Sequence, residues 1–250
     1  ALTESGTIKP HLVRWSHPAD PGTLPSSWDV NDPTTDAGEQ DLSDVESGGI
    51  QDGLPLRGTF VIYKQHATHL MRIVGGQNIM QFDQFLGRSG ILTQNCVQLT
   101  GDGGFHFVVT EDDVIIHDTV QVRSVVDRRM RKYLFNQIDG DNVAKSYVFA
   151  NPRQKEMWFC YPSNGSTVVD RAFIWSYGSG GVNGVCYEAD YPFPWTALGD
   201  VDVSSETTWA AASGSWDSYY GAWNSSDKRR PVAVSTSGDR FLVLDSSLQR

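Results

Sequence analysis

The sequence predicts an all-β fold: β-propeller-like antiparallel blades, with one short helix and a long acidic N-terminal arm. Three observations lead to this prediction. The 250 residues include 24 glycines and 11% aromatics but only 20% charged residues, a composition that favours strands and tight turns. Short apolar segments alternate with turn signals along most of the chain. Similar hairpins recur at intervals of roughly 45–55 residues.

The predicted strands are short and follow one another closely. A first strand is expected over 8–15, and no other before residue 58. The remaining strands are predicted within 58–64, 69–76, 79–87, 96–126 (four strands), 147–165, 170–182, 184–195 and 230–247. The segment 199–229, rich in Ser, Trp and Gly, fits no element.

One helix is predicted, over residues 125–138. Asp127 is a suitable N-cap, because its carboxylate can accept hydrogen bonds from the first free amides. Met130, Leu134 and Ile138 share one helical face at intervals of four residues.

The recurring hairpins indicate how the strands assemble. One small sheet cannot bury both of its faces, whereas radial stacking of several sheets can. This favours a propeller, and a β-sandwich of similar hairpins is the alternative. The hairpins are GTFVIYK with HLMRI, GFHFVVT with VIIHD, KEMWFCYPS with AFIWSY, and the final DRFLVLDS.

Residues 16–56 form the acidic arm, with nine carboxylates and no Lys or Arg. Like charges repel and its prolines oppose ladder pairing, so we expect an extended segment that reaches a neighbouring subunit or partner. The expected organisation is an N-terminal strand and arm over 1–57 and a propeller-like domain over 58–250. Whether the chain is a fragment of a longer one stays open. A solvated loop is the alternative. Trp15, Trp28 and Leu42 are the expected interface anchors.

The strongest basic cluster is Arg128, Arg129, Arg131 and Lys132, within the predicted helix. Three interpretations stay open. The cluster can form salt bridges with acidic neighbours, contact a partner or the backbone of DNA in a channel, or complement the acidic arm of the same or another chain.

The ionisable residues do not predict an enzyme, a cofactor or a metal site. Glu111, Asp112 and Asp113 are consecutive in a turn, where carboxylates serve solvation and turn hydrogen bonds. The six histidines lack helical ligand spacing, although His106 and His117 are expected on paired strands. Asp139 begins a run like a calcium loop without its later Glu. The three cysteines are expected as buried, reduced thiols.

Charge and hydropathy exclude further classes. The net charge of −10 and pI near 4.9 oppose tight binding of nucleic acid through its phosphates, although an acidic wall suits a passage through which DNA slides. No apolar run is long enough to span a membrane, and no secretory signal pattern is expected.

The order of motifs over residues 50–135 resembles the tail nozzle (tail hub or stabilisation) proteins of short-tailed bacteriophages. No single motif is diagnostic, and the signal is their order. The pieces are I-x-x-G-x-P-L-x-G-T-F-V-I-Y-K, R-I-V-G-G, I-M-Q-F-D, G-I-L-T-Q-N-C-V, G-G-F-H-F-V-V-T-E-D-D-V-I-I-H-D and V-R-S-V-V-D-R-R-M-R-K-Y-L-F. Residues 147–191 also fit. The family's usual Asp-Gly after the acidic-turn strand reads Asp118-Thr119 here.

The resemblance implies a structural virion protein without enzymatic activity: a propeller-like domain in a homohexameric ring around a DNA channel. The implied partners are further copies, the head-to-tail adaptor, tail fibre or spike proteins, and DNA that passes through the channel without sequence-specific binding. The implied location is the virion tail, assembled in the host cytoplasm. The alternative is a carbohydrate-binding or glycan-cleaving propeller, supported by the Trp- and Tyr-rich stretch 209–223. A cellular scaffold that binds peptides is a third hypothesis.

Overall fold

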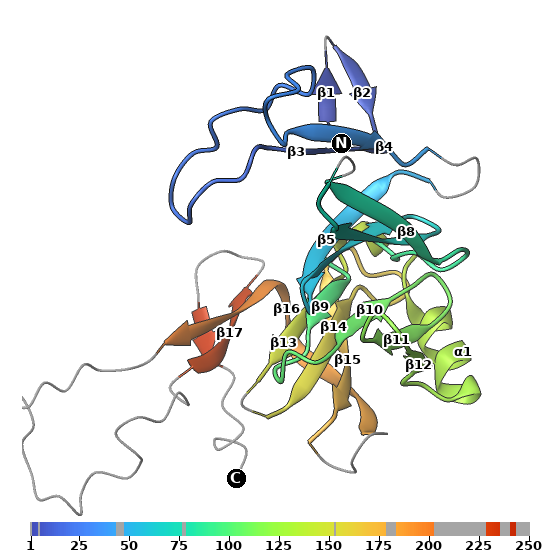
Figure 1. Cartoon of the computed structure of the whole chain (residues 1–250). Coiled ribbons are helices and arrows are strands. Elements are labelled where there is room, and N and C mark those ends of the chain that lie inside the picture. The colour runs from blue at the N-terminus through green and yellow to red at the C-terminus, as the bar shows by residue number, and fades with distance from the viewer. Residues whose placement is uncertain are drawn as a thin grey trace, which may run out of the picture. The chain divides into compact units, whose positions relative to one another are not determined.

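The computed structural model describes residues 2–4, 6–43, 48–76, 79–152, 154–178, 184–202, 229–235 and 241–243. The chain divides into two compact units, Ala1–Lys132 and Tyr133–Arg250. The described residues form five antiparallel sheets, one α-helix and one short 3-10 helix (Figure 1). About 7% of the structure is helical, so the prediction of an all-β fold is confirmed.

Two four-stranded sheets form the body of the first unit, each with its strands in sequence order. The first contains β5 (Ile50–Leu56), β6 (Thr59–Lys64), β7 (Thr68–Ile73) and β8 (Met80–Leu86). The second contains β9 (Val97–Leu99), β10 (His106–Val109), β11 (Val114–His117) and β12 (Val122–Ser124). The four strands expected within 96–126 are thereby confirmed.

The second part of β6 is buried, whereas Phe60 near its start is 42% exposed. Val61, Ile62 and Tyr63 have at most 2% of their surface exposed, and Tyr63 contacts the second sheet. The next residue, Lys64, is also buried and donates a hydrogen bond from Nζ to the Leu42 carbonyl of the N-terminal segment at 2.6 Å. The N-terminal segment is therefore part of the folded unit.

The acidic segment does not run as an extended arm. Its residues Gly38–Asp41 form β4, which pairs with β3 (Leu12–Trp15), beside a smaller ladder of β1 (Leu2–Glu4) and β2 (Thr7–Lys9). Its last residues form β5 of the first sheet. The expected boundary at residue 57 therefore falls inside the β5–β6 hairpin. The turn of this hairpin has two residues of positive φ, Arg57 (50°) and Gly58 (76°), as tight hairpins require.

The helix α1 (Arg128–Gln137) confirms the predicted helix. Asp127 is its N-cap, as predicted: its Oδ1 accepts hydrogen bonds from the amides of Arg129 and Met130, both at 2.8 Å. Leu134 is buried, and Met130 and Ile138 are half-buried. A short 3-10 helix follows over Val143–Lys145.

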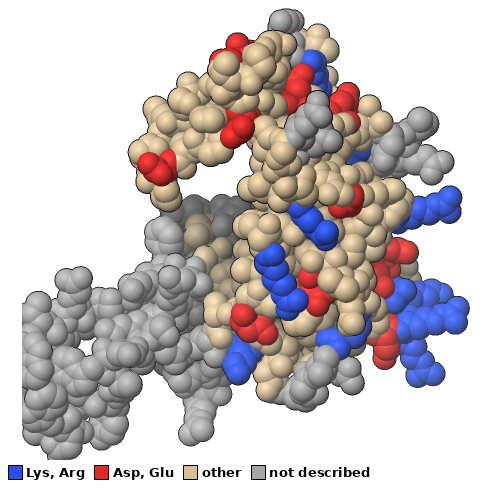
Figure 2. Space-filling model, in the orientation of Figure 1, with Lys and Arg blue, Asp and Glu red and all other residues tan. Residues whose placement is uncertain are grey.

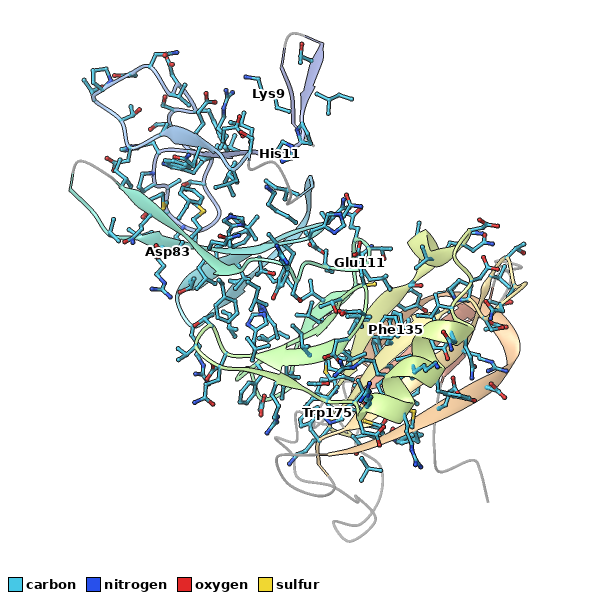
Figure 3. All side chains as sticks on the ribbon, turned by 90° about the vertical axis from the view of Figure 1, so that its right-hand side faces the viewer. Lys9, His11, Asp83, Glu111, Phe135 and Trp175 are labelled. Atoms are coloured by element: carbon cyan, nitrogen blue, oxygen red, sulfur yellow. The ribbon has the colours of Figure 1, made fainter. Side chains whose placement is uncertain are left out.

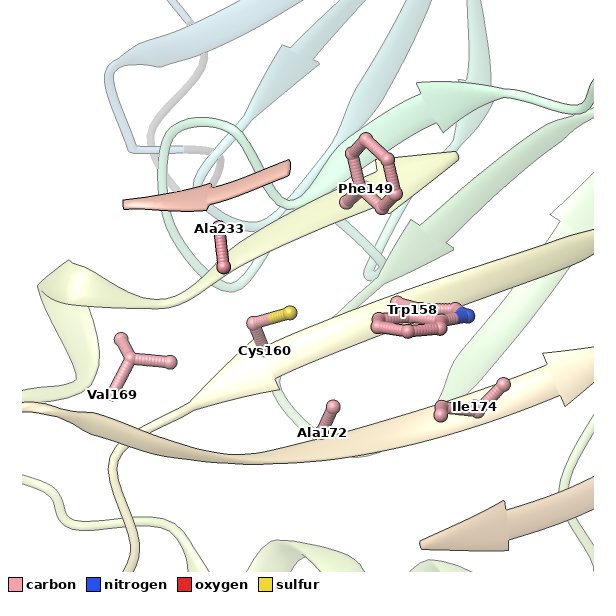
Figure 4. Close-up of a cluster of buried hydrophobic side chains, with 7 residues drawn as sticks. All are labelled: Phe149, Trp158, Cys160, Val169, Ala172, Ile174 and Ala233. Carbon is pink, nitrogen blue, oxygen red and sulfur yellow. The ribbon is translucent and has the colours of Figure 1, made fainter. Parts of the chain in front are cut away.

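The second unit contains one six-stranded sheet, again in sequence order. Its strands are β13 (Tyr147–Asn151), β14 (Glu156–Tyr161), β15 (Val169–Ser176), β16 (Val185–Asp202), β17 (Arg229–Ser235) and β18 (Phe241–Val243). The 18-residue β16 pairs with β15 mainly along its first part and with β17 along its second, with register shifts near Trp195. Ala233 of β17 thereby joins an apolar core with Trp158, Cys160 and Ile174 (Figure 4).

The three larger sheets start at regular intervals. The first strands begin at Ile50, Val97 and Tyr147, so the spacings are 47 residues (97 − 50) and 50 residues (147 − 97). These intervals agree with the expected repeat. The third sheet differs from the expected blade because it has six strands. Most of the unassigned segment 199–229 lies outside the described residues.

Candidate functional site

The start of α1 carries the basic surface predicted from the sequence. Arg128, Arg129 and Lys132 are exposed, and none of them forms an ion pair with another residue that the structure describes. Figure 2 shows Lys and Arg side chains gathered where Figure 1 places α1. These three cations can therefore bind an acidic partner without first breaking an internal contact.

Arg131 is used differently from its three neighbours. Its Nη2 lies 2.8 Å from Asp113 Oδ2 and donates to Ser124 Oγ at 3.2 Å. Burial raises the pKa of Asp113, while hydrogen bonds from Ser124 and the Val114 amide, and the charge of Arg131, oppose that rise. The salt-bridge interpretation of the basic cluster thus holds for Arg131. This pair ties the start of the helix to β11 and β12.

An acidic loop spans residues 16–37, between β3 and β4. Its carboxylates order the loop by accepting from backbone amides two residues further on. Asp29 accepts from the Asn31 amide and Asp32 from the Thr34 amide, each at 2.9 Å. The Thr34 hydrogen bonds hold the pKa of Asp32 below its usual value. The amide of Asp36 also donates to His17 Nδ1 at 3.0 Å. Local hydrogen bonds therefore give the loop a defined shape despite its charge.

The three expected anchors lie in different environments. Leu42 is buried, and its carbonyl accepts the hydrogen bond from Lys64. Trp15 packs near Phe82, with ring centroids 5.8 Å apart, and donates from Nε1 to the Asp36 carbonyl at 2.9 Å. A Cβ at Gly38 would lie only 2.4 Å from the Trp15 ring, so glycine is required beneath it. Trp28 is 54% exposed and is the one of the three that projects from the loop.

A buried polar cluster joins the two four-stranded sheets. Tyr63 Oη of β6 lies 2.7 Å from His106 Nδ1 of β10 and 2.7 Å from His117 Nε2 of β11. His106 Nε2 lies 3.1 Å from the Pro55 carbonyl of β5. The sequence placed the two histidines on paired strands, which is correct. It did not identify Tyr63, which is separated from the two histidines by 43 and 54 positions along the sequence.

The hydrogen bonds of this cluster have a single direction when both histidines are neutral. A carbonyl only accepts, so His106 Nε2 donates to Pro55 and its Nδ1 accepts from the Tyr63 hydroxyl. Tyr63 in turn accepts from His117 Nε2. Burial lowers the pKa of His106 to about 4, and burial together with His106 lowers that of His117 to about 4. Burial also raises the pKa of Tyr63.

This cluster has the character of a structural joint. All three side chains have at most 1% of their surface exposed, and their mutual hydrogen bonds consume the Tyr63 hydroxyl. His117 Nδ1 has no hydrogen-bond partner in the described part of the chain.

The acidic residues that the sequence singled out lie in turns. Glu111, labelled in Figure 3, lies in the turn after β10, and its Oε1 is 3.3 Å from His66 Nδ1. Asp139 accepts from the amides of Asn142 and Gly165.

The described residues contain no group of three or more His, Cys, Asp or Glu side chains placed to hold a metal ion. Within the same residues, no helix has the length and apolarity needed to cross a membrane. The aromatic stretch 209–223, which motivated the carbohydrate hypothesis, lies outside the described residues. A scan against protein-family models found no match to the chain, and a search of curated proteins found none either.

Proposed function

We propose that the chain is a structural component of a bacteriophage tail, a nozzle or hub protein that assembles as a ring around the path of the genome. The observation that carries the proposal is the series of antiparallel sheets that start 47 and 50 residues apart (Ile50, Val97 and Tyr147). Sheets repeated at this spacing are typical of propeller blades, whose stacking covers their apolar faces.

The order of motifs supports the same family. The Tyr-Lys motif ends β6, the Gly-Gly pair follows β7, the acidic turn joins β10 to β11, and the basic segment begins α1. Where Asp118-Thr119 replaces the family's usual Asp-Gly, Thr119 has a φ of 76°. This is the backbone region that glycine favours, so the substitution keeps the type of turn.

The charge of the chain suits such a role. A protein of net charge −10 repels the phosphate backbone, so DNA can move along its surface without being held by counterion release. In this proposal, several copies of the chain form the ring, and six copies is the number to test first. The head-to-tail adaptor and fibre or spike proteins bind its two ends in the virion.

Electron microscopy of the purified chain, combined with light scattering, tests the proposal. We expect ring-shaped particles with a central opening and a mass that is a whole multiple of 27.7 kDa. A monomer at every concentration would contradict it. Specific binding on a glycan array, or release of reducing sugar, would favour the carbohydrate-binding or glycan-cleaving alternative.

A further inference from the structure

We propose that the acidic loop 16–37 of one copy binds the start of α1 of a second copy. In this contact Asp20, Asp29 and Asp36 face Arg128, Arg129 and Lys132, and the Trp28 ring stacks on a guanidinium. The inference rests on the proposed ring assembly and assigns the two surfaces that join its subunits.

The loop exposes both negative charge and an aromatic ring. It contains four carboxylates and no Lys or Arg, and Asp20, Asp29 and Asp36 are exposed. Among the other described acidic residues of this segment, Glu39 pairs with Arg14 at 2.6 Å. Asp52 accepts from the Asn95 amide at 3.0 Å. The loop therefore presents three exposed carboxylates to a partner.

The helix offers a complementary surface. Arg128 and Lys132 are four residues apart and Arg129 and Lys132 three apart, so the three cations lie on neighbouring positions of one helix surface. The Arg131–Asp113 pair fixes the first turn against β11 and β12. Guanidinium groups bind carboxylates through two hydrogen bonds and stack on indole rings. An acidic loop carrying a tryptophan therefore matches this surface better than an uncharged one would.

The two surfaces lie apart within the first unit of one copy. Both lie in the first unit, and Figures 1 and 3 show the loop and the start of α1 at opposite ends of that unit. A contact between two different surfaces of identical chains is head-to-tail, and repetition of such a contact closes a ring when the rotation permits. DNA is a less favourable occupant, because three free cations on a chain of net charge −10 face a polyanion that the rest of the protein repels.

Charge reversal tests the contact. The loop variant Asp20→Lys, Asp29→Asn, Asp36→Lys keeps the turn acceptor at position 29. The helix variant is Arg128→Glu, Arg129→Glu, Lys132→Glu. We expect each variant to weaken self-association about tenfold at low salt, measured by light scattering. The variant with both sets should recover association, because opposite charges again face each other. Salt above about 0.3 M should reduce the differences.

A matched control separates this contact from a general charge effect. Glu111→Lys, Asp112→Lys, Asp141→Asn changes the net charge as much as the loop variant does, at exposed positions elsewhere, and should leave association unchanged. Trp28→Ala should weaken association at low and high salt alike. Circular dichroism confirms that each variant is folded.

Three results would overturn the contact. The first is normal association of either single-surface variant. The second is failure of the combined variant to recover. The third is loss of duplex DNA binding in the helix variant while association stays normal, which would assign the helix to DNA. If rings persist through all variants, this contact is wrong and the proposed function stands. If the unaltered chain never associates, both are wrong.

Discussion

The two units of this protein differ in the chemistry found in their interiors. In the first unit, a directed chain of hydrogen bonds through Tyr63, His106 and His117 passes between two four-stranded sheets. In the second, the six-stranded sheet brings Ala233 onto apolar side chains such as Cys160 and Ile174. The polar joint specifies one relative placement of the sheets, because each donor needs its own acceptor. The apolar core depends on volume and packing instead.

The comparison also predicts different responses to pH. All six histidines of the chain lie at or before residue 117, so the second unit contains none. Burial has lowered the pKa of both joint histidines well below their unfolded value of 6.5. As the pH falls, these histidines therefore take up protons at a higher pH in the unfolded chain than in the folded first unit. Mild acid consequently favours unfolding of that unit.

The largest expected effect is acid destabilisation of the first unit alone. As the pH falls from 6.5 to 5, each joint histidine should cost about 2 kcal/mol of stability, because the unfolded state is protonated and the folded state is not. Hydrogen exchange with mass spectrometry, corrected for intrinsic rates, should show lost protection in β6, β10 and β11. Equal loss of protection in β14 and β15 would contradict the comparison.

The next effect concerns the apolar core. Ile174 is 2% exposed, so Ile174→Ala removes buried methyl groups and should destabilise the second unit by about 3 kcal/mol. The buried Cys160 reports opening of this unit and Cys96 opening of the first. Labelling of Cys160 should accelerate strongly while that of Cys96 does not. Ile174→Val, expected to cost about 1 kcal/mol, is the control.

Tyr63→Phe should have a smaller effect, confined to the first unit. The change leaves His106 Nδ1 and His117 Nε2 buried without their partner, at a cost of about 2 kcal/mol. Burial raises the pKa of Cys96 to about 12, so its thiol reacts only after opening, and its labelling should accelerate. Tyr187→Phe is the matched control. Tyr187 is 41% exposed and donates to Glu156 at 2.6 Å, so water can replace its bond. Equal effects of the two changes would show that the joint is not special.

The smallest expected effect is an increase, not a decrease, in the stability of the first unit. Thr119 is a β-branched residue at a φ of 76°, which costs about 1 kcal/mol relative to glycine. Thr119→Gly should therefore raise the midpoint of chemical unfolding of the first unit slightly. Thr119→Ala, which keeps a Cβ at this φ, should give less. A lower midpoint for Thr119→Gly would mean that the threonine side chain contributes a contact that outweighs the strain.

The comparison shows which features a sequence can reveal. Strands with local turns, such as β13 and β14 around Asn151, and the helix capped by Asp127, follow from patterns within a few residues. β5 was missed because it contains Gly53 and Pro55, which are rare in strands. The structure explains their presence: β5 is an edge strand, where a missing amide donor is tolerated.

The candidate site was predictable in part for the same reason. The basic cluster is visible in the sequence, but the pairing of Arg131 with Asp113 depends on how α1 lies against β11 and β12. The acidic segment looked unable to fold on itself because the count of charges omitted Arg14, two residues before it. A charge count also does not reveal the hydrogen bonds that Asp29 and Asp32 accept from amides two residues further on.

The long strand β16 has a mechanical consequence. Its second part is paired with β17, which in turn pairs with β18, while the order of the sheet leaves β13 and β14 bonded to neither. A pulling force applied at the carboxyl end would load these ladders one hydrogen bond at a time. Strands β18 and then β17 would peel away at low tension, and the ladders among β13, β14 and β15 would stay intact. The last two strands would therefore separate first, without rupture of the sheet behind them.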